Sequence, residues 1–246
     1  MELCQQGDRC RRIDSRELMF PDFKPDILYA LDLDGVLIDS IEECYQICVI
    51  TFQGEDFCNK EEKELFYKYR GLVQPAHEFY YLMLSIKVCL KKHACKVDQL
   101  FAGYKKNART VEADHFEKQF FQNRRRLQEK DLKNWRALNP LTAFGKHVQK
   151  EKPKNMVIIT TKNTDSAKAI IEYHKIYPRK IYGNDHVKDA GSKGKLLNAI
   201  LEKSPLKRMI FIDDATEHLN TVDNKNIRCY FAGWGYGEKN NDYISY

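Results

Sequence analysis

Short apolar runs alternate with amphipathic, charged stretches along much of this chain. The first run begins at Ile27 and is followed at once by Asp32-Leu33-Asp34-Gly35, so it predicts a buried strand that ends in carboxylates. Similar runs predict strands at 156–160, 180–182, 209–213 and 228–232, with helical patterns between them at 164–174, at 193–202 and from residue 217. Strands that alternate with helices predict an α/β fold with a doubly wound parallel sheet.

This alternation is interrupted after the first predicted strand by roughly 95 residues that carry only a helical pattern. Residues 61–70 and 75–92 have apolar positions at helical spacing, and Phe116, Phe120, Leu127, Trp135 and Leu138 mark one face of a long charged helix or of a broken pair. We therefore expect an irregular arm over residues 1–26, an α/β core from 27–42 and 140–246, and an inserted all-helical domain over 43–139.

The cysteine spacing and the distribution of apolar residues give no indication of a zinc-binding, membrane-spanning or secreted protein. None of the eight cysteines forms a C-x-x-C pair or a zinc-like spacing, so we expect reduced thiols that act as small apolar residues. No apolar run approaches the roughly 20 residues that span a bilayer. The first 20 residues carry scattered charges where a signal peptide needs an apolar stretch. These features predict a cytoplasmic protein without a membrane partner.

The net charge of +6 comes mostly from one segment, residues 105–136, where ten basic residues face five acidic ones. Such a stretch can attract phosphate-rich partners. It is more typical of the solvated face of a helix, so we do not expect a nucleic-acid partner. If nucleic acid does bind there, the binding should depend strongly on salt.

Polar side chains follow three of the predicted strands. Asp32 and Asp34 end the first, Thr160 ends the second and is followed by Thr161, and Asp213 and Asp214 end the fourth. Ligands of open α/β sheets bind beyond the carboxyl ends of the strands. Carboxylates that are buried together at such an edge need a cation to neutralise them. Packing alone does not account for this set, so we interpret it as a reactive site.

A magnesium ion is the cation that this donor set favours, because Mg²⁺ prefers a few carboxylates, water and substrate phosphate oxygens. Asp32, Asp213 and the backbone carbonyl of Asp34 are the expected ligands, with Asp214 as a ligand or as an outer partner. Asp32 can then attack a phosphoryl group and form an aspartyl-phosphate. Asp34 can protonate the leaving oxygen and later take a proton from water.

The motifs also resemble those of a known family. The run Leu31 to Ser40, LDLDGVLIDS, resembles the first motif of the haloacid dehalogenase superfamily, above all that of phosphatases similar to phosphoglycolate phosphatase. The segments 157–162, 192–196 and 211–214 resemble the second, third and fourth motifs in the family's order. The closing stretch 232–237, AGWGYG, is similar to one common near the C-terminus of these phosphatases.

This resemblance implies an Asp nucleophile, an acid/base Asp, Mg²⁺ and a helical cap between the first and second motifs, where the predicted insertion lies. It also implies phosphate binding by Thr160 or Thr161 and by a lysine of the third motif. Lys193 is the preferred lysine, with Lys195 and Lys188 as alternatives. From the insertion, Arg70 is a tentative substrate-binding residue, since arginine suits carboxylate and phosphate groups.

Asp34 narrows the expected reaction. Dehalogenases similar to this family lack an acid at that place, and transport ATPases have threonine there. An acid at this position fits hydrolysis of a phosphate ester, and a closing cap favours a small phosphorylated metabolite. A phosphotyrosine phosphatase, a sugar phosphomutase and a non-catalytic binding module on the same core are the alternative functions.

Overall fold

The computed structural model describes residues 22–54, 59–92, 96–107 and 110–237. Most of the predicted arm over residues 1–26 therefore lies outside the described residues. The described chain divides into two compact units. Among the described residues, the sheet unit comprises 22–37, 143–168 and 175–237, and the helical unit comprises those between 38 and 142 together with 169–174.

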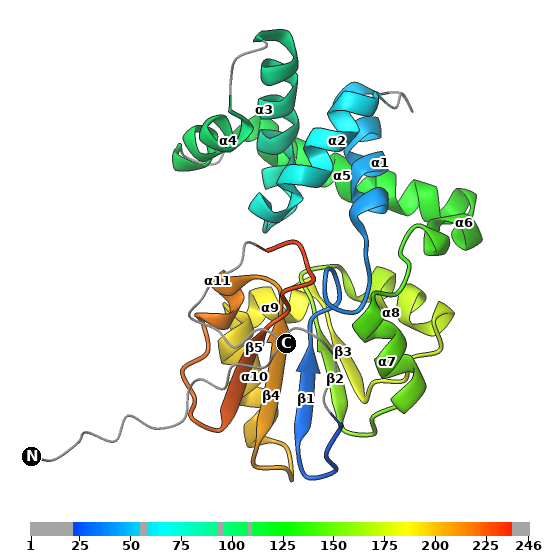
Figure 1. Cartoon of the computed structure of the whole chain (residues 1–246), viewed down its shortest axis with the longest axis vertical. Coiled ribbons are helices and arrows are strands. Elements are labelled where there is room, and N and C mark those ends of the chain that lie inside the picture. Colours follow the sequence, from blue (N-terminus) through cyan, green and yellow to red (C-terminus); the bar gives the residue numbers. More distant parts are fainter. Residues whose placement is uncertain (1–21, 55–58, 93–95, 108–109, 238–246) are drawn as a thin grey trace, which may run out of the picture. The chain divides into compact units, whose positions relative to one another are not determined.

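The sheet unit is built on five parallel strands in the order β3-β2-β1-β4-β5 (Figure 1). The strands are β1 (Leu28–Leu31), β2 (Met156–Ile159), β3 (Lys180–Tyr182), β4 (Met209–Asp213) and β5 (Ile227–Phe231). All residues of β1 and β2 are buried, which explains why these strands are continuous apolar runs rather than alternating ones. The predicted doubly wound parallel sheet is thus confirmed.

Helices connect the strands. They are α7 (Ala143–Glu151), α8 (Thr164–Tyr173), α9 (Asn184–Ala190), α10 (Lys193–Glu202) and α11 (Thr216–Leu219), and α6 (Leu132–Ala137) precedes them at the end of the helical segment. Leucines of α10 and α11 pack with Leu28, Ala30 and Phe211 on one face of the sheet. Parallel strands are almost always joined by right-handed crossovers, a rule that predicts the opposite face for α7, which precedes β2.

The strand order defines where a ligand can bind. From β1 the chain proceeds to β2 and β3 on one side, and then crosses to β4 and β5 on the other side. The connections after β1 and β4 therefore leave in opposite directions. In open α/β sheets this switch point opens a crevice at the carboxyl ends of the strands. Asp32 follows β1 and Asp213 ends β4, so both lie at this crevice.

The helical unit contains the all-helical insertion. Its further elements are α1 (Ile41–Gln53), α2 (Lys60–Tyr69), the short 3₁₀ helix η1 (Arg70–Leu72), α3 (Glu78–Lys92), α4 (Val97–Lys106) and α5 (Val111–Lys130). The core of this unit is rich in aromatic side chains, with Phe66, Phe79 and Phe120 stacked in succession. The predicted charged helix is a broken pair: α5 ends at Lys130, and the side chain of the next residue, Asp131, caps α6.

Some predicted details are wrong. The helix expected to begin at Pro75 begins at Glu78, and α7 and α9 did not stand out in the sequence because both are short. Cys89 in α3 is disulfide-bonded, so the expectation of reduced thiols fails at that residue, while Cys44, Cys48 and Cys229 are in the thiol form. Within the described ranges, no helix is both long and apolar enough to cross a membrane.

Arg124, the first residue of the Arg124-Arg125-Arg126 run, is buried rather than solvated. Its guanidinium donates two hydrogen bonds to the Glu43 carboxylate, at 2.7 and 2.9 Å, and lies 4.7 Å from the centre of the Phe120 ring. The indole N–H of Trp135 donates to the same carboxylate at 2.9 Å. This basic position therefore joins α1, α5 and α6, whereas Arg125 is exposed.

We expect Arg124→Met to lower the free energy of unfolding by about 3–5 kcal/mol, because Glu43 would remain buried without its counter-charge. Urea denaturation of the full chain measures the change. The matched control is Arg125→Met, which should stay within about 0.5 kcal/mol of the parent protein. Equal stabilities for the two variants would show that the ion pair is not a stabilising contact.

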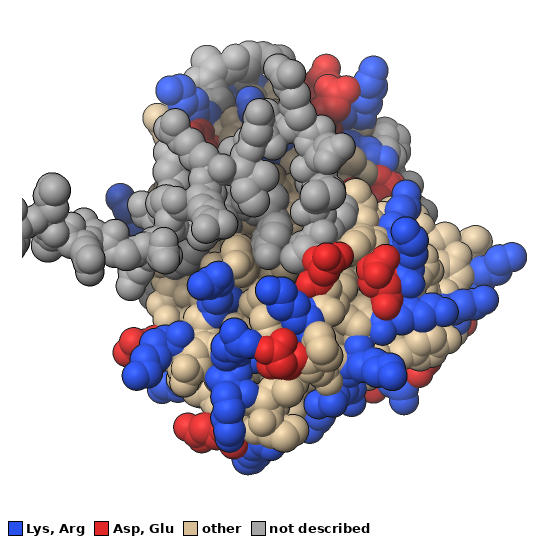
Figure 2. Space-filling view, turned by 60° about the horizontal axis from the view of Figure 1, so that its bottom comes forward, with Lys and Arg blue, Asp and Glu red and all other residues tan. Residues whose placement is uncertain are grey.

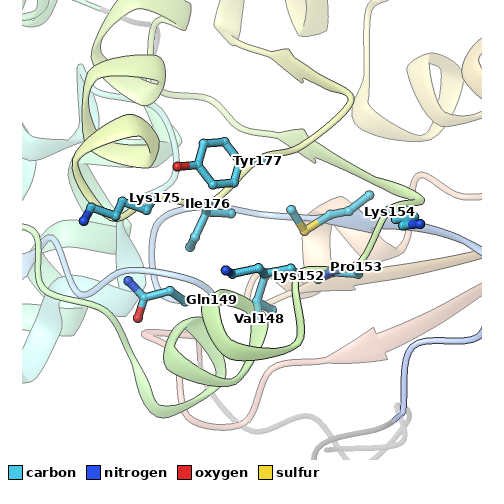
Figure 3. A pocket seen from close by; sticks show the side chains of 9 residues that line it. Val148, Gln149, Lys152, Pro153, Lys154, Lys175, Ile176 and Tyr177 are labelled. Atoms are coloured by element: carbon cyan, nitrogen blue, oxygen red, sulfur yellow. The ribbon is translucent and has the colours of Figure 1, made fainter.

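A small cavity of about 170 Å³ lies at the amino-terminal edge of β2, between the ends of α7 and α8 (Figure 3). Lys152, Lys154 and Lys175 line it above an apolar floor. Lys152 and Lys175 have φ angles of 49° and 54°, the left-handed conformation that often ends a helix.

Figure 2, which turns the bottom of the Figure 1 view forward, shows many Lys and Arg side chains interspersed with acidic ones.

Candidate active site

Three carboxylates meet at the switch point of the sheet. Asp32 follows β1, and its N–H donates to the carbonyl of Ile212 at 2.9 Å. This hydrogen bond fixes the register of Asp32 relative to β4. Asp213 ends β4, and Asp214 is the next residue. Each of the three side chains offers an oxygen within 4.8 Å of the others, and all three residues are buried. The pairing of β1 with β4 thus brings together the two acidic motifs.

Lys193 is the lysine that reaches these carboxylates. It is the first residue of α10, where the Ser192 hydroxyl caps the helix by accepting the N–H of Lys195. The Lys193 ammonium lies 2.8 Å from an Asp32 oxygen and 2.7 Å from an Asp213 oxygen, and the residue is only 1% exposed. Lys188 and Lys195 are both exposed. The geometry therefore favours Lys193 among the three candidate lysines.

Burial and charge act against each other at this site. Burial raises the pKa of Asp32 to about 6, although the Lys193 ammonium acts to lower it. For Asp213, burial acts to raise the pKa, but Lys193 and His218 outweigh it and hold the pKa below its usual range. Burial also acts to lower the pKa of Lys193, yet the carboxylates of Asp213 and Asp32 hold it above its ordinary value. Lys193 is therefore a permanent cation at the site.

These residues fit a hard divalent cation. Three carboxylates and one ammonium leave an excess of negative charge in a buried place, which is costly unless a further cation compensates it. All the converging acceptor atoms are oxygens, and the cluster contains no thiolate, so the donor set suits Mg²⁺ better than a soft metal.

The raised pKa of Asp32 predicts how metal binding depends on pH. Below about pH 6 the metal-free protein carries a proton on Asp32, and a metal must displace that proton to use the carboxylate. We expect the dissociation constant for Mg²⁺ to rise about tenfold for each pH unit below 6 and to be flat above it. Calorimetric titration of Mg²⁺ in buffers with different ionisation heats measures the affinity and the released proton together. A constant Mg²⁺ affinity between pH 5 and 7 would contradict the assignment of Asp32 as a metal ligand.

The second predicted motif follows β2, the neighbour of β1. Thr160 is buried, and its hydroxyl accepts the backbone N–H of Lys162 at 3.1 Å, while Thr161 is half-buried. The ammonium of Lys162 forms an ion pair with Asp34 at 3.1 Å. The Asp34 side chain is 17% exposed, against 8% for Asp32, so it keeps access to solvent. The side chain of Asp34 does not belong to the carboxylate cluster, and its predicted contribution to metal binding through the backbone remains a prediction.

The whole chain is similar in structure to several solved hydrolases. A haloacid dehalogenase-like hydrolase from Streptococcus pneumoniae matches with a TM-score of 0.55 and 20% identity, over 90% of this chain and 94% of its own. A predicted phosphoglycolate phosphatase from Haemophilus somnus matches with a TM-score of 0.55 and 14% identity, over 86% and 88%. This chain has the haloacid dehalogenase-like fold.

The similarity extends to a structure with a bound metal ion. A haloacid dehalogenase-type hydrolase from Bacillus subtilis, solved with bound magnesium, matches with a TM-score of 0.50 and 11% identity, over 84% of this chain and 88% of its own. No protein-family model and no curated protein sequence matches the chain. The haloacid dehalogenase-like fold is therefore established by the arrangement of the backbone rather than by sequence identity.

Sequence reasoning missed two residues at this end of the haloacid dehalogenase-like core. Lys162 was part of the second motif, but no role was predicted for it, although its place directly after Thr160 and Thr161 was a usable signal. His218 in α11 has its Nδ1 at 3.1 Å from Asp213, and nothing in the sequence around it indicated this contact.

Arg70 belongs to the helical unit. Its guanidinium donates to the carbonyl of Val73 at 3.0 Å and lies 4.9 Å from the centre of the Phe79 ring. Both contacts are internal to that unit and fix the turn after α2. Its proposed role in binding substrate remains a prediction.

Proposed function

We propose that this protein is a magnesium-dependent phosphatase that hydrolyses a small phosphomonoester through an aspartyl-phosphate. The observation that carries the proposal is the buried cluster of Asp32, Asp213, Asp214 and Lys193 at the switch point of a haloacid dehalogenase-like fold. A fold alone does not define a reaction. The proposal therefore depends on the chemistry that these side chains can perform.

In the first step a carboxylate oxygen of Asp32 attacks phosphorus, and the bond between phosphorus and the ester oxygen breaks. The electron pair goes to the ester oxygen, which takes a proton from Asp34. In the second step a water molecule gives a proton back to Asp34 and attacks the aspartyl-phosphate, which releases inorganic phosphate and restores the Asp32 carboxylate. Lys193 and Thr160 bind the oxygens of the phosphoryl group and stabilise their charge.

Asp32, Asp213 and Asp214 would hold the Mg²⁺ ion, with the backbone carbonyl of Asp34 as a further donor. The ion would supply charge that shields the attacking carboxylate from the phosphate and that polarises the phosphoryl group. The magnesium-bound Bacillus subtilis structure of the same fold supports this choice of metal. The predicted phosphoglycolate phosphatase among the structural matches supports a small phosphorylated substrate.

A panel of phosphate esters tests this function. The purified full chain would be incubated with phosphorylated metabolites, p-nitrophenyl phosphate and phosphotyrosine peptides, with Mg²⁺ or with EDTA. We expect phosphate release that requires Mg²⁺, with the highest kcat/KM for a small metabolite. Preference for the peptides would support a protein phosphatase instead. Isomerisation of a sugar phosphate without net release would support a mutase, and the absence of any metal-dependent turnover would overturn the proposal.

A purely binding role is less well supported. A non-catalytic module has no need of a buried lysine between two carboxylates, which costs desolvation energy. Nucleic-acid binding through residues 105–136 loses one of its cations, because Arg124 is buried against Glu43. A flat binding isotherm for nucleic acid at low salt would exclude that second role.

A further inference from the structure

The glycine-rich stretch after the last strand, residues 233–237, has no part in the reaction described above. The chain leaves β5 at Phe231 and turns back toward β4: the N–H of Ala232 donates to the carbonyl of Asp213, and the N–H of Gly235 donates to the carbonyl of Ala232, both at 2.9 Å. This turn directs the following residues to the carboxyl end of β4. The stretch therefore reaches the acidic motif itself.

One carboxylate oxygen of Asp214 is held by this stretch. The backbone N–H of Tyr236 donates to Oδ2 of Asp214 at 2.7 Å. A hydrogen bond to a charged acceptor is shorter and stronger than a neutral one, so it fixes the rotation of the carboxylate. Asp214 is also one of the three residues that offer an oxygen to the acidic cluster.

Glycines are required around Asp214 by space. A Cβ atom on Gly235 would lie 2.3 Å from the Asp214 Cβ, and one on Gly237 would lie 1.7 Å from the Asp214 carbonyl oxygen. On the other side, a Cβ on Gly35 would lie 2.2 Å from Asp214 Oδ2, and Gly35 also has a φ angle of 79°. The backbone therefore encloses this carboxylate from the stretch 233–237 and from the loop that carries Asp32.

Trp234 links the stretch 233–237 to the loop that carries Asp32. Its indole N–H donates to the carbonyl of Val36 at 3.1 Å, one residue beyond Gly35 in the loop after Asp32. The centre of its ring lies 5.2 Å from the centre of the Phe144 ring in α7, so the two aromatic side chains pack against each other. The same residue thus connects the stretch that holds Asp214 to the loop that begins at Asp32.

We propose that residues 233–237 set the metal affinity of the acidic cluster, with Trp234 as the anchor that positions Asp214 against Asp32. This inference rests on the proposed function only in that the cluster binds Mg²⁺. Partners that orient a metal ligand typically change metal affinity by about 10–100-fold when they are removed. Trp234 is a positioning residue, since it acts through Asp214 and does not touch the reacting atoms.

The decisive variant is Trp234→Phe, which removes the N–H donor and keeps an aromatic ring beside Phe144. Calorimetric titration of the full, metal-free chain with MgCl₂ should give a dissociation constant about tenfold higher than that of the parent protein. Turnover at saturating Mg²⁺ should stay within about twofold. The matched control is Trp135→Phe, which removes the chain's other indole donor from Glu43 in the helical unit and should leave the Mg²⁺ affinity unchanged.

The control variant also provides a readout that does not depend on activity. In Trp135→Phe the only tryptophan is Trp234, so its fluorescence should change with MgCl₂ and saturate at the calorimetric dissociation constant. A second variant, Gly235→Ala, places a methyl group against Asp214 and should weaken Mg²⁺ binding by about a hundredfold. If Gly235→Ala does not fold, Trp234→Phe still decides the question.

The outcomes separate the two proposals. If the parent protein does not bind Mg²⁺ at all, the metal assignment in the proposed function fails, and this inference fails with it. If the parent protein binds Mg²⁺ and Trp234→Phe binds it equally well, only the positioning role of residues 233–237 is overturned.

Discussion

Replacing Asp32 by Asn is expected to abolish magnesium-dependent phosphate release, with kcat falling by at least about 10⁴-fold. The amide keeps the shape of the side chain and its buried place beside Lys193, but it cannot form the aspartyl-phosphate. The variant should fold, because the substitution removes a carboxylate whose pKa is already raised by burial. Circular dichroism and thermal unfolding establish that point before the assay is interpreted.

Asp26→Asn is the matched control for this variant. Asp26 precedes β1, whereas Asp32 follows it, so the same chemical change is made at opposite ends of one strand. Asp26 is exposed and forms an ion pair with Arg208, which is worth little at a protein surface. Activity should be unchanged. Retention of magnesium-dependent turnover in Asp32→Asn would exclude Asp32 as the nucleophile.

Lys193→Met is expected to lower kcat by about 10³-fold, a loss of the size seen when a preorganised charge at a transition state is removed. It should also lower the free energy of unfolding by about 3 kcal/mol in the absence of metal, because Asp32 and Asp213 would remain buried without their shared counter-ion. Bound Mg²⁺ should restore part of this stability, by about 2.7 kcal/mol at one hundred times the dissociation constant.

Thermal unfolding with and without MgCl₂ measures this effect, and Lys195→Met is the control. Lys195 lies two residues further along α10 and is exposed, so its removal should change neither turnover nor stability. This pair of variants also distinguishes Lys193 from Lys195 as the phosphate-binding lysine. A larger loss of activity in Lys195→Met than in Lys193→Met would reverse the assignment.

Strands β1 and β2 were predictable from the sequence because they are buried on both faces of the sheet. A strand such as Met156–Ile159 must then be apolar throughout, and such short runs are distinctive in a charged chain. The long helices of the insertion were predictable from their apolar spacing. The short helices α7 and α9 were not, because they have too few turns to establish a period.

The meeting of Asp32, Asp213 and Asp214 was predictable because the carboxyl ends of parallel strands lie at one edge of the sheet. The roles of these residues in catalysis and metal binding remain predictions. The partners of the site residues were less predictable. The ion pair between Lys162 and Asp34 and the contact of His218 with Asp213 depend on where loops from separate strands meet, and this information is not local in the sequence. Similarly, the burial of Arg124 depends on Glu43, which is far from it in the chain but adjacent in the helical unit.

The position of the insertion affects how the newly made chain can fold. The central strand β1 is made first, but its neighbours β2 and β4 follow only after the whole of α1 to α7 has been synthesised, and the pairing of β1 with β2 joins Leu31 to Ile158. At synthesis rates of about 5–20 residues per second, β1 waits roughly 6–25 s for a partner. During that time the helical segment can fold, whereas β1 remains an unpaired apolar strand. Production of this protein should therefore depend on chaperones that shield the nascent chain more than production of a chain without the insertion would.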